Sequence, residues 1–193
     1  ARGPQTHPRL TAAGRPRRWH KPSAAVTTGV MARAEIRDAD RAEVAEFIER
    51  HWGNKIVMSR GKAFYPHEEQ GFLERRDGAI VGLLTYHIDE EGMEILTLNS
   101  TLEGAGIGSS LLLSAIDTAR REGCCKVWLT TTNDRLRVID FHQRLGFRMT
   151  AVNLGVVDEA RKIKPQIPLV GERGVPIHDE VVMELAIEPY LDS

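Results

Sequence analysis

Apolar positions between residues 32 and 187 follow two different spacings, which separate the predicted helices from the predicted strands. They recur every three or four residues, as on the buried face of a helix, in the segments 40–52, 106–122 and 134–145. Shorter runs that alternate or stay apolar predict strands at 32–37, 71–75, 79–87, 94–99, 126–131, 147–157 and 180–187. This order of elements predicts an α/β (α+β) domain, in which helices pack on one mixed sheet.

Residues that favour turns and loops separate these predicted helices and strands. Asp77 and Gly78 stand between two predicted strands, and this pair is a strong signal for a tight hairpin. Residues 56–65 show no clear period and are predicted to be irregular. Residues 164–178 are rich in Pro and Gly, which predicts a long loop before the last strand.

The first 30 residues differ in composition from the rest of the chain. They hold six of the 26 Lys and Arg residues, no acidic residue and no hydrophobic period, so a disordered basic extension is predicted. Periodic structure begins just after Met31, which favours Met31 as the natural start and 31–193 as the folded domain. An organelle transit peptide is the alternative interpretation, because such peptides are also basic and poor in acids.

Composition and charge narrow the classes of function. The longest apolar run, 79–86, is much shorter than the roughly 20 residues that cross a bilayer, so no membrane partner is expected. Residues 31–193 hold 20 basic and 27 acidic residues, a balance that argues against general nucleic-acid binding. Cys124 and Cys125 are adjacent and match no disulfide framework or metal-ligand spacing, which predicts a reducing, cytoplasmic location and no metal.

The most informative segment, Glu103 to Ser110, reads EGAGIGSS and lies between a predicted strand and a predicted helix. Its glycines let the backbone approach a ligand closely, and the first N–H groups of a helix attract phosphate. A pyrophosphate ligand is therefore predicted. Two alternatives stay open: a dinucleotide fingerprint, although Ser109 stands where its third glycine belongs, and a turn that only packs the helix against the strand.

Two motifs together resemble the GNAT family of acetyltransferases, and in particular a bacterial subgroup. The family's coenzyme A signature is Arg/Gln-x-x-Gly-x-Gly/Ala, and Gly106 and Gly108 match its two small positions. The strand end at Asn133 and the segment FHQRLGF around His142 resemble the second half of the family pattern. The resemblance implies a mixed, mostly antiparallel sheet of about six to seven strands flanked by helices.

The resemblance also implies an activity: an N-acetyltransferase that moves an acetyl group from acetyl-CoA to an amine, as a possible homodimer and without a metal. It implies that the coenzyme binds at Leu96, Leu98, Glu103, Gly104, Ala105, Gly106, Ile107, Gly108, Ser109 and Asn133. The loop 158–180 is expected to cover the acceptor. Because Glu103 replaces the usual Arg or Gln and His142 the usual Tyr, a coenzyme-binding regulatory module without turnover stays open. A purely structural or interaction domain is the third alternative.

Two side chains are candidates for the chemistry. An alkylamine is protonated near neutral pH, so its attack needs a base, and the resemblance implies Glu94 in that role. Asp179 and Glu180 are weaker alternatives, as is a water relay. His142 stands where the family commonly has a Tyr that protonates the leaving thiolate. Three interpretations of His142 stay open: a protonated acid, a neutral hydrogen-bond donor to sulfur, and a packed core residue.

Overall fold

The computed structural model describes residues 31–190. The predicted disordered extension, residues 1–30, lies outside them. Between residues 31 and 190, no helix combines the length and the apolar character needed to cross a membrane.

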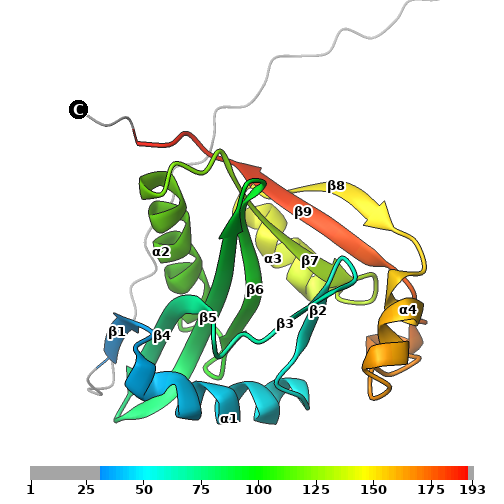
Figure 1. The fold of residues 1–193 in the computed structure, drawn as a ribbon, viewed down its shortest axis with the longest axis horizontal. Coiled ribbons are helices and arrows are strands. Elements are labelled where there is room, and N and C mark those ends of the chain that lie inside the picture. Colours follow the sequence, from blue (N-terminus) through cyan, green and yellow to red (C-terminus); the bar gives the residue numbers. More distant parts are fainter. Residues whose placement is uncertain (1–30, 191–193) are drawn as a thin grey trace, which may run out of the picture.

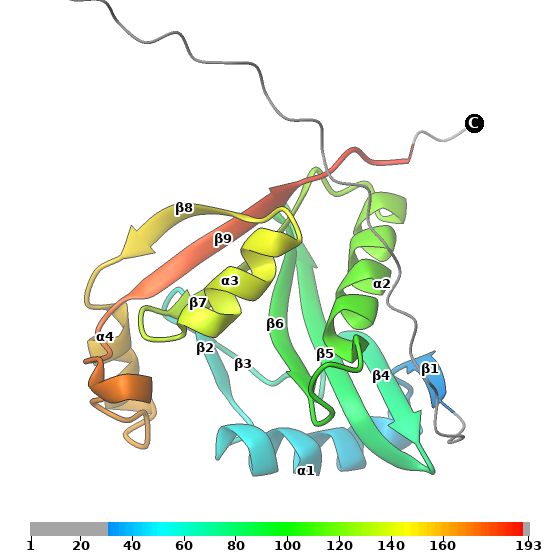
Figure 2. The same ribbon diagram turned by 180° about the vertical axis from the view of Figure 1, so that it is seen from behind.

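One seven-stranded sheet forms the centre of the protein, in the order β1-β4-β5-β6-β7-β9-β8 (Figure 1, Figure 2). Its strands are β1 (Met31–Glu35), β4 (Gln70–Arg76), β5 (Ala79–Asp89), β6 (Gly92–Ser100), β7 (Lys126–Thr132), β8 (Arg148–Asn153) and β9 (Glu180–Ala186). Neighbouring strands are antiparallel except β6 and β7, which are parallel. The predicted fold class, a mixed and mostly antiparallel α+β sheet, is therefore confirmed.

Helices cover both faces of this sheet. They are α1 (Arg41–Trp52), α2 (Ile107–Arg121), α3 (Leu136–Arg144) and α4 (Val156–Ile163), with short 3-10 helices at Asp38–Asp40 and Glu172–Gly174. Alternation along β5 points successive side chains to opposite faces. Leu83 packs with Ile48 of α1, whereas Leu84 belongs to a larger core with Leu112 of α2. Partly buried side chains of α3 pack on that same larger core, and Figure 2 shows α2 and α3 on one face.

Two predictions about local structure were wrong. Residues 56–65 are not irregular: β2 (Val57–Ser59) pairs with β3 (Lys62–Phe64) in a small second sheet. The turn between them places Arg60 and Gly61 at φ angles of 45° and 76°. Strands of three residues are too short to display a period of two, and a non-glycine residue in left-handed backbone is an uncommon turn signal.

The predicted strand 147–157 is too long at its end. β8 stops at Asn153, Gly155 turns the chain with a φ of 70°, and α4 begins at Val156. The β-branched residues after Gly155 favour a strand locally, but Val157 and Ala160, three residues apart, bury one face of a helix instead. Tertiary packing therefore overrides the local preference there. The predicted hairpin at Asp77 and Gly78 is confirmed.

Candidate active site

β6 and β7 pair only near their starts. Met93 lies opposite Val127 and Glu94 opposite Trp128. Beyond these pairs, β6 continues beside β5 and β7 beside β9. The two parallel strands therefore separate after Glu94, and the sheet opens between them.

A bulge in β6 lies at the start of this opening. On β5, Tyr86 pairs with Ile95 and Thr85 pairs with Thr97, so Leu96 is an extra residue in the register. Pairing with β7 has already ended there. The backbone of Leu96 thus has no register partner on either neighbouring strand. Bulges are over-represented next to active sites.

The opening continues into a groove of about 410 Å³, a size typical of small-molecule sites. β6, β7, the start of α2 and one face of α3 form its walls. Its lining includes Leu96, Leu98, Glu103, Gly108, Leu129, Arg137, Phe141 and His142. Four of the residues predicted to bind the coenzyme and the predicted acid His142 therefore lie along one groove.

The predicted phosphate turn leads directly into α2. Gly104 and Gly106, on either side of Ala105, have φ angles of 73° and 76°, a conformation that residues with a Cβ rarely adopt. Gly106 caps the helix, and its carbonyl accepts the first helical hydrogen bond from Ser110 at 3.0 Å. The N–H groups of residues 107–109 precede that bond and have no partner inside the helix. Together with the helix dipole they form a site for an anion.

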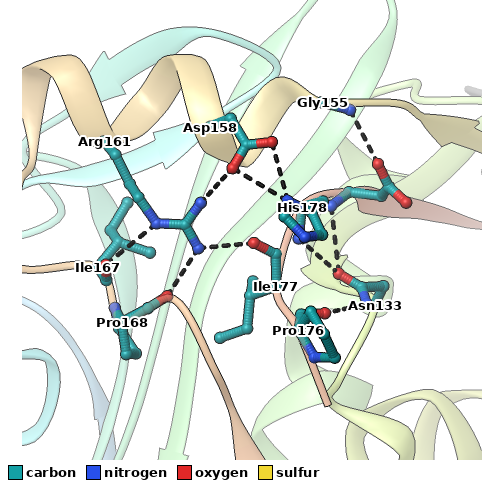
Figure 3. A network of polar contacts seen from close by, with 10 residues as sticks. Asn133, Gly155, Asp158, Arg161, Ile167, Pro168, Pro176, Ile177 and His178 are labelled. Carbon is teal, nitrogen blue, oxygen red and sulfur yellow. Dashed lines mark hydrogen bonds and ion pairs between the residues drawn. The ribbon is translucent and has the colours of Figure 1, made fainter.

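Asn133 holds a loop in place and is not part of the groove lining (Figure 3). Its Nδ2 donates to the carbonyl of Pro176 at 2.9 Å. Its Oδ1 accepts hydrogen bonds from the backbone N–H groups of His178 and Asp179. These three bonds fix the end of the 164–178 loop beside β7. A contact between Asn133 and the coenzyme stays a prediction.

Glu94 lies where the two strands separate and is only 4% exposed. Ser59 Oγ donates a hydrogen bond to Glu94 Oε1, and the same hydroxyl lies 3.1 Å from Thr130 Oγ1. Burial raises the pKa of Glu94, while the hydrogen bond from Ser59 opposes part of that rise. The carboxyl group lines a small cavity of about 130 Å³. Glu94 is therefore a buried group that gains a proton more readily than an ordinary glutamate.

Of the two alternative bases, Glu180 lines this small cavity and Asp179 does not. Glu180 Oε2 accepts a hydrogen bond from the backbone N–H of Arg60 at 3.1 Å, and burial raises the pKa of Glu180. Asp179 accepts the N–H of Gly155 at 2.8 Å and so fixes the start of α4. In the described part of the chain, no three His, Cys, Asp or Glu side chains gather in a way that could hold a metal ion.

His142 is 3% exposed and contributes to the groove wall. Its Nδ1 lies 2.8 Å from the carbonyl of Val138. A carbonyl only accepts, so Nδ1 carries the proton and the neutral ring has a lone pair on Nε2. Nε2 is buried without a hydrogen-bond partner among residues 31–190, and burial lowers the pKa of His142. A neutral His142 therefore cannot donate from Nε2, which argues against the second of its three interpretations.

A third cavity, of about 480 Å³, lies between β2, α4 and the 164–178 loop, and is named here the loop-side pocket. The small cavity shares Leu96 with the groove, and it shares Arg135 and Glu180 with the loop-side pocket. Trp52 lines all three, and its Nε1 donates to Asn99 Oδ1 at 2.7 Å. The three cavities are therefore neighbours, and the small cavity of Glu94 shares wall residues with both of the others.

Sequence analysis missed several residues that line these three cavities: Trp52, Ser59, Arg137 and Lys164. Arg137 had a usable signal, because it stands four residues before Phe141 on the helix face that also presents Val138 and His142. Ser59 had none, since it lies in a short strand without a visible period. Its place beside Glu94 follows only from the folding of distant segments.

Residues 33–147 match the model of the Acetyltransferase (GNAT) family. The chain therefore belongs to the GNAT acetyltransferase family, as its glycine turn and its FHQRLGF segment predict.

Solved structures of acetyltransferases share this fold, and a curated relative covers most of the chain. The uncharacterized protein YdhI of Bacillus subtilis is 36% identical over 146 residues, which cover 75% of this chain and 91% of that protein. The structure of an IAA acetyltransferase from Bacillus cereus has a TM-score of 0.60 at 18% identity and covers 82% of this chain and 100% of that one. A GNAT family acetyltransferase from Elizabethkingia anophelis with acetyl-CoA bound has a TM-score of 0.58 at 17% identity, covering 81% and 98%. At such identities the structural likeness shows the fold, and a homodimer and a cytoplasmic location stay predictions.

Proposed function

We propose that this chain is an N-acetyltransferase that transfers an acetyl group from acetyl-CoA to an amine, with residues 31–193 as its catalytic domain. The observation that carries the proposal is that the cavity of Glu94 shares wall residues with both the groove and the loop-side pocket. A donor in the groove and an acceptor in the pocket meet beside a buried carboxyl group. Membership of the GNAT family and the acetyl-CoA held by the Elizabethkingia anophelis protein support this assignment.

Three features of the groove fit acetyl-CoA. The free N–H groups at the start of α2 suit a diphosphate, and no acidic residue lies in the first turn of α2. Arg137 lines the groove and offers the positive charge that Glu103 does not. The buried, unpartnered Nε2 of His142 also fits a ligand, because buried polar atoms normally have a hydrogen-bond partner. We infer that Leu98, Gly108 and Arg137 hold the coenzyme.

Bound acetyl-CoA supplies an activated acetyl group as a thioester. Glu94 takes a proton from the acceptor amine, and Ser59 keeps its carboxylate oriented. Leu96 has no register partner on β5 or β7. Its backbone N–H donates a hydrogen bond to the carbonyl oxygen of the thioester as that oxygen gains negative charge. His142, once protonated on Nε2, donates a proton to the departing sulfur.

The environments of Glu94 and His142 oppose their catalytic states. A base must be deprotonated, yet burial raises the pKa of Glu94. An acid must be protonated, yet burial lowers the pKa of His142. The two shifts narrow the pH range in which both groups hold the required form, so we expect a bell-shaped rate profile with a reduced maximum.

The pH dependence of His142 variants tests the acid. Imidazolium is lost as pH rises through the lowered pKa, so His142→Phe should reduce kcat most on the acid side of neutrality and little above pH ~8. His142→Tyr should extend activity to higher pH, because a phenol keeps its proton up to about pH 10. Full pH–rate profiles of the three proteins provide the measurement. Equal turnover of wild type and His142→Phe at every pH would assign His142 to packing alone.

Binding and turnover of acetyl-CoA test the proposed function itself. At about 100 times its dissociation constant, acetyl-CoA should add about 2.7 kcal/mol to the free energy of unfolding. A panel of amines should then release free CoA thiol, measured with a thiol reagent. Stabilisation without any turned-over amine would favour the regulatory module without turnover. An unchanged melting curve in excess acetyl-CoA would contradict coenzyme binding.

A further inference from the structure

The wall of the loop-side pocket combines apolar, acidic and basic side chains. Much of it is apolar, with Val57, Met58, Val157, Ala160, Ile167 and Ile177 among its lining. Glu180 belongs to both this pocket and the small cavity of Glu94, so it marks the inner end. Two cationic side chains, Arg135 and Lys164, also line the pocket. Arg135 also lines the small cavity, so it lies at the inner end with Glu180, whereas Lys164 and the carboxylate of Asp134 line the loop-side pocket alone. An occupant therefore meets charges of both signs at the inner end, apolar surface over much of the wall, and Lys164.

Lys164 is the less expected of the two cations because it is only 9% exposed. Its Nζ donates to the carbonyl of Ile56 at 2.9 Å, and no carboxylate of residues 31–190 forms an ion pair with it. Burial lowers the pKa of Lys164. A buried ammonium with three donors and one neutral partner is costly, and an anionic ligand relieves that cost.

The pocket is held in shape by a second arginine (Figure 3). Arg161 of α4 donates to the carbonyls of Ile167 at 3.2 Å and Pro168 at 2.7 Å, on one limb of the loop. It also donates to the carbonyl of Ile177 at 2.6 Å, on the other limb. Asn133 ties the second limb to the end of β7. A wall fixed in this way loses little conformational entropy when a ligand binds.

We propose that the acceptor is a small amino acid with an apolar side chain, bound with its amine toward Glu94 and Glu180 and its carboxylate on Lys164. The proposal rests on the acetyltransferase function proposed above. In the reaction a C–N bond forms between the amine and the acetyl carbon while the C–S bond of the thioester breaks. The amine proton passes to Glu94, and the sulfur leaves as the thiol after protonation.

The charges of the pocket disfavour other amines. A diamine or polyamine would bring a second cation toward Arg135 and Lys164, and like charges repel. The further carboxylate of the wall, Asp134, already has partners of its own, including the hydroxyl of Thr132. The amino terminus of a protein has no carboxylate of its own beside the amine. A pocket of about 480 Å³ also suits a small molecule in preference to a folded partner.

The wild-type protein gives the first arm of the test. L-Methionine, L-leucine and L-phenylalanine are compared with their carboxamides as acceptors, by thiol release from acetyl-CoA. The amine of a carboxamide is less basic, so more of it is neutral and chemistry alone favours the amide. We nevertheless expect kcat/KM to be at least about tenfold higher for the free acids, as for a hydrogen bond to a charged group. Equal or better turnover of the amides, of peptides or of polyamines would overturn the proposal and leave the acetyltransferase function standing.

Lys164→Met gives the second arm, with Lys162→Met as its matched control. Lys162 lies two residues earlier, in the last turn of α4, is exposed and pairs with Glu159. Lys164→Met should lower kcat/KM for L-methionine about tenfold or more while leaving L-methioninamide within about threefold. Lys162→Met should change neither. Equal losses for acid and amide in the Lys164 variant would contradict the contact with carboxylate.

Binding without turnover gives a third arm, which does not depend on the catalytic step. L-Methionine should raise the melting temperature of the wild-type protein saturated with CoA, and L-methioninamide should raise it less. The same ranking should be lost in Lys164→Met, provided that variant still shows the shift caused by CoA. Absence of turnover with this ranking intact would reject the acetyltransferase function but support the binding site. Absence of both would reject the proposed ligand.

Discussion

Glu94→Gln is expected to lower kcat by about 10²- to 10⁴-fold, the usual contribution of a positioned general base. The substitution keeps the shape of the side chain and an oxygen that accepts the hydrogen bond from Ser59. It removes only the ability to take a proton. Because the groove lies to one side of Glu94, the stabilisation produced by acetyl-CoA should remain.

The pH profile separates a base from a merely buried carboxyl group. In the wild type, kcat/KM should fall as pH drops through the raised pKa of Glu94, since protonation removes the base. Glu94→Gln should lack this acidic limb. Glu74→Gln is the matched control, because Glu74 is equally buried but lies outside all three cavities. Retention of the Glu94→Gln rate within a factor of two would move the role to Glu180 or to water.

Glu94→Gln should also make the folded protein more stable at high pH, although it lowers the rate. A carboxyl group whose pKa is raised in the folded state binds its proton more tightly there than in the unfolded chain. It therefore costs nothing below the unfolded pKa, costs progressively more as pH rises from the unfolded to the folded pKa, and reaches its full cost above the folded pKa. Glu94→Gln should accordingly melt at a higher temperature than wild type at pH ~8 and at a similar temperature at pH ~4. A gain in stability with a loss of rate is typical of a catalytic group.

The parts of the fold that were predictable are those specified by local sequence. Asp77 and Gly78 fix a hairpin because both adopt positive φ. The glycine turn before α2 is equally local, since its geometry depends on Gly104 and Gly106. By contrast, α4 begins with a β-branched pair that favours a strand, and only burial against the rest of the protein decides for the helix.

Some residues of the candidate site could likewise be found from local sequence, and others could not. Residues on one element with a regular spacing, such as Gly108 on α2, could be found from the sequence. The neighbours of Glu94 could not, because Ser59 is 35 positions away and Glu180 lies farther still along the chain. Lys164 was equally hidden in a loop of mixed charge. Its meaning depends on burial, which sequence spacing does not reveal.

Gly108→Asp is expected to abolish the stabilisation by acetyl-CoA. In wild type the coenzyme at about 100 times its dissociation constant should add about 2.7 kcal/mol, or about 5–11 °C in melting temperature for a chain of this size. Gly108 is the second residue of α2 and lines the groove. A carboxylate there takes the place of the phosphate at the free N–H groups and repels its charge.

Failure to fold would not explain such a loss. A Cβ at Gly108 would lie 3.6 Å from Phe141 Cζ, an ordinary contact, and φ is not positive there. An acidic side chain in the first turn of a helix even stabilises it, by about 0.3–1 kcal/mol, so the free variant should melt at or above the wild-type temperature. Gly108→Asn, which is similar in size but uncharged, separates repulsion from crowding. We expect it to keep part of the shift, and Gly108→Ala most of it. A full acetyl-CoA shift in Gly108→Asp would place the diphosphate elsewhere.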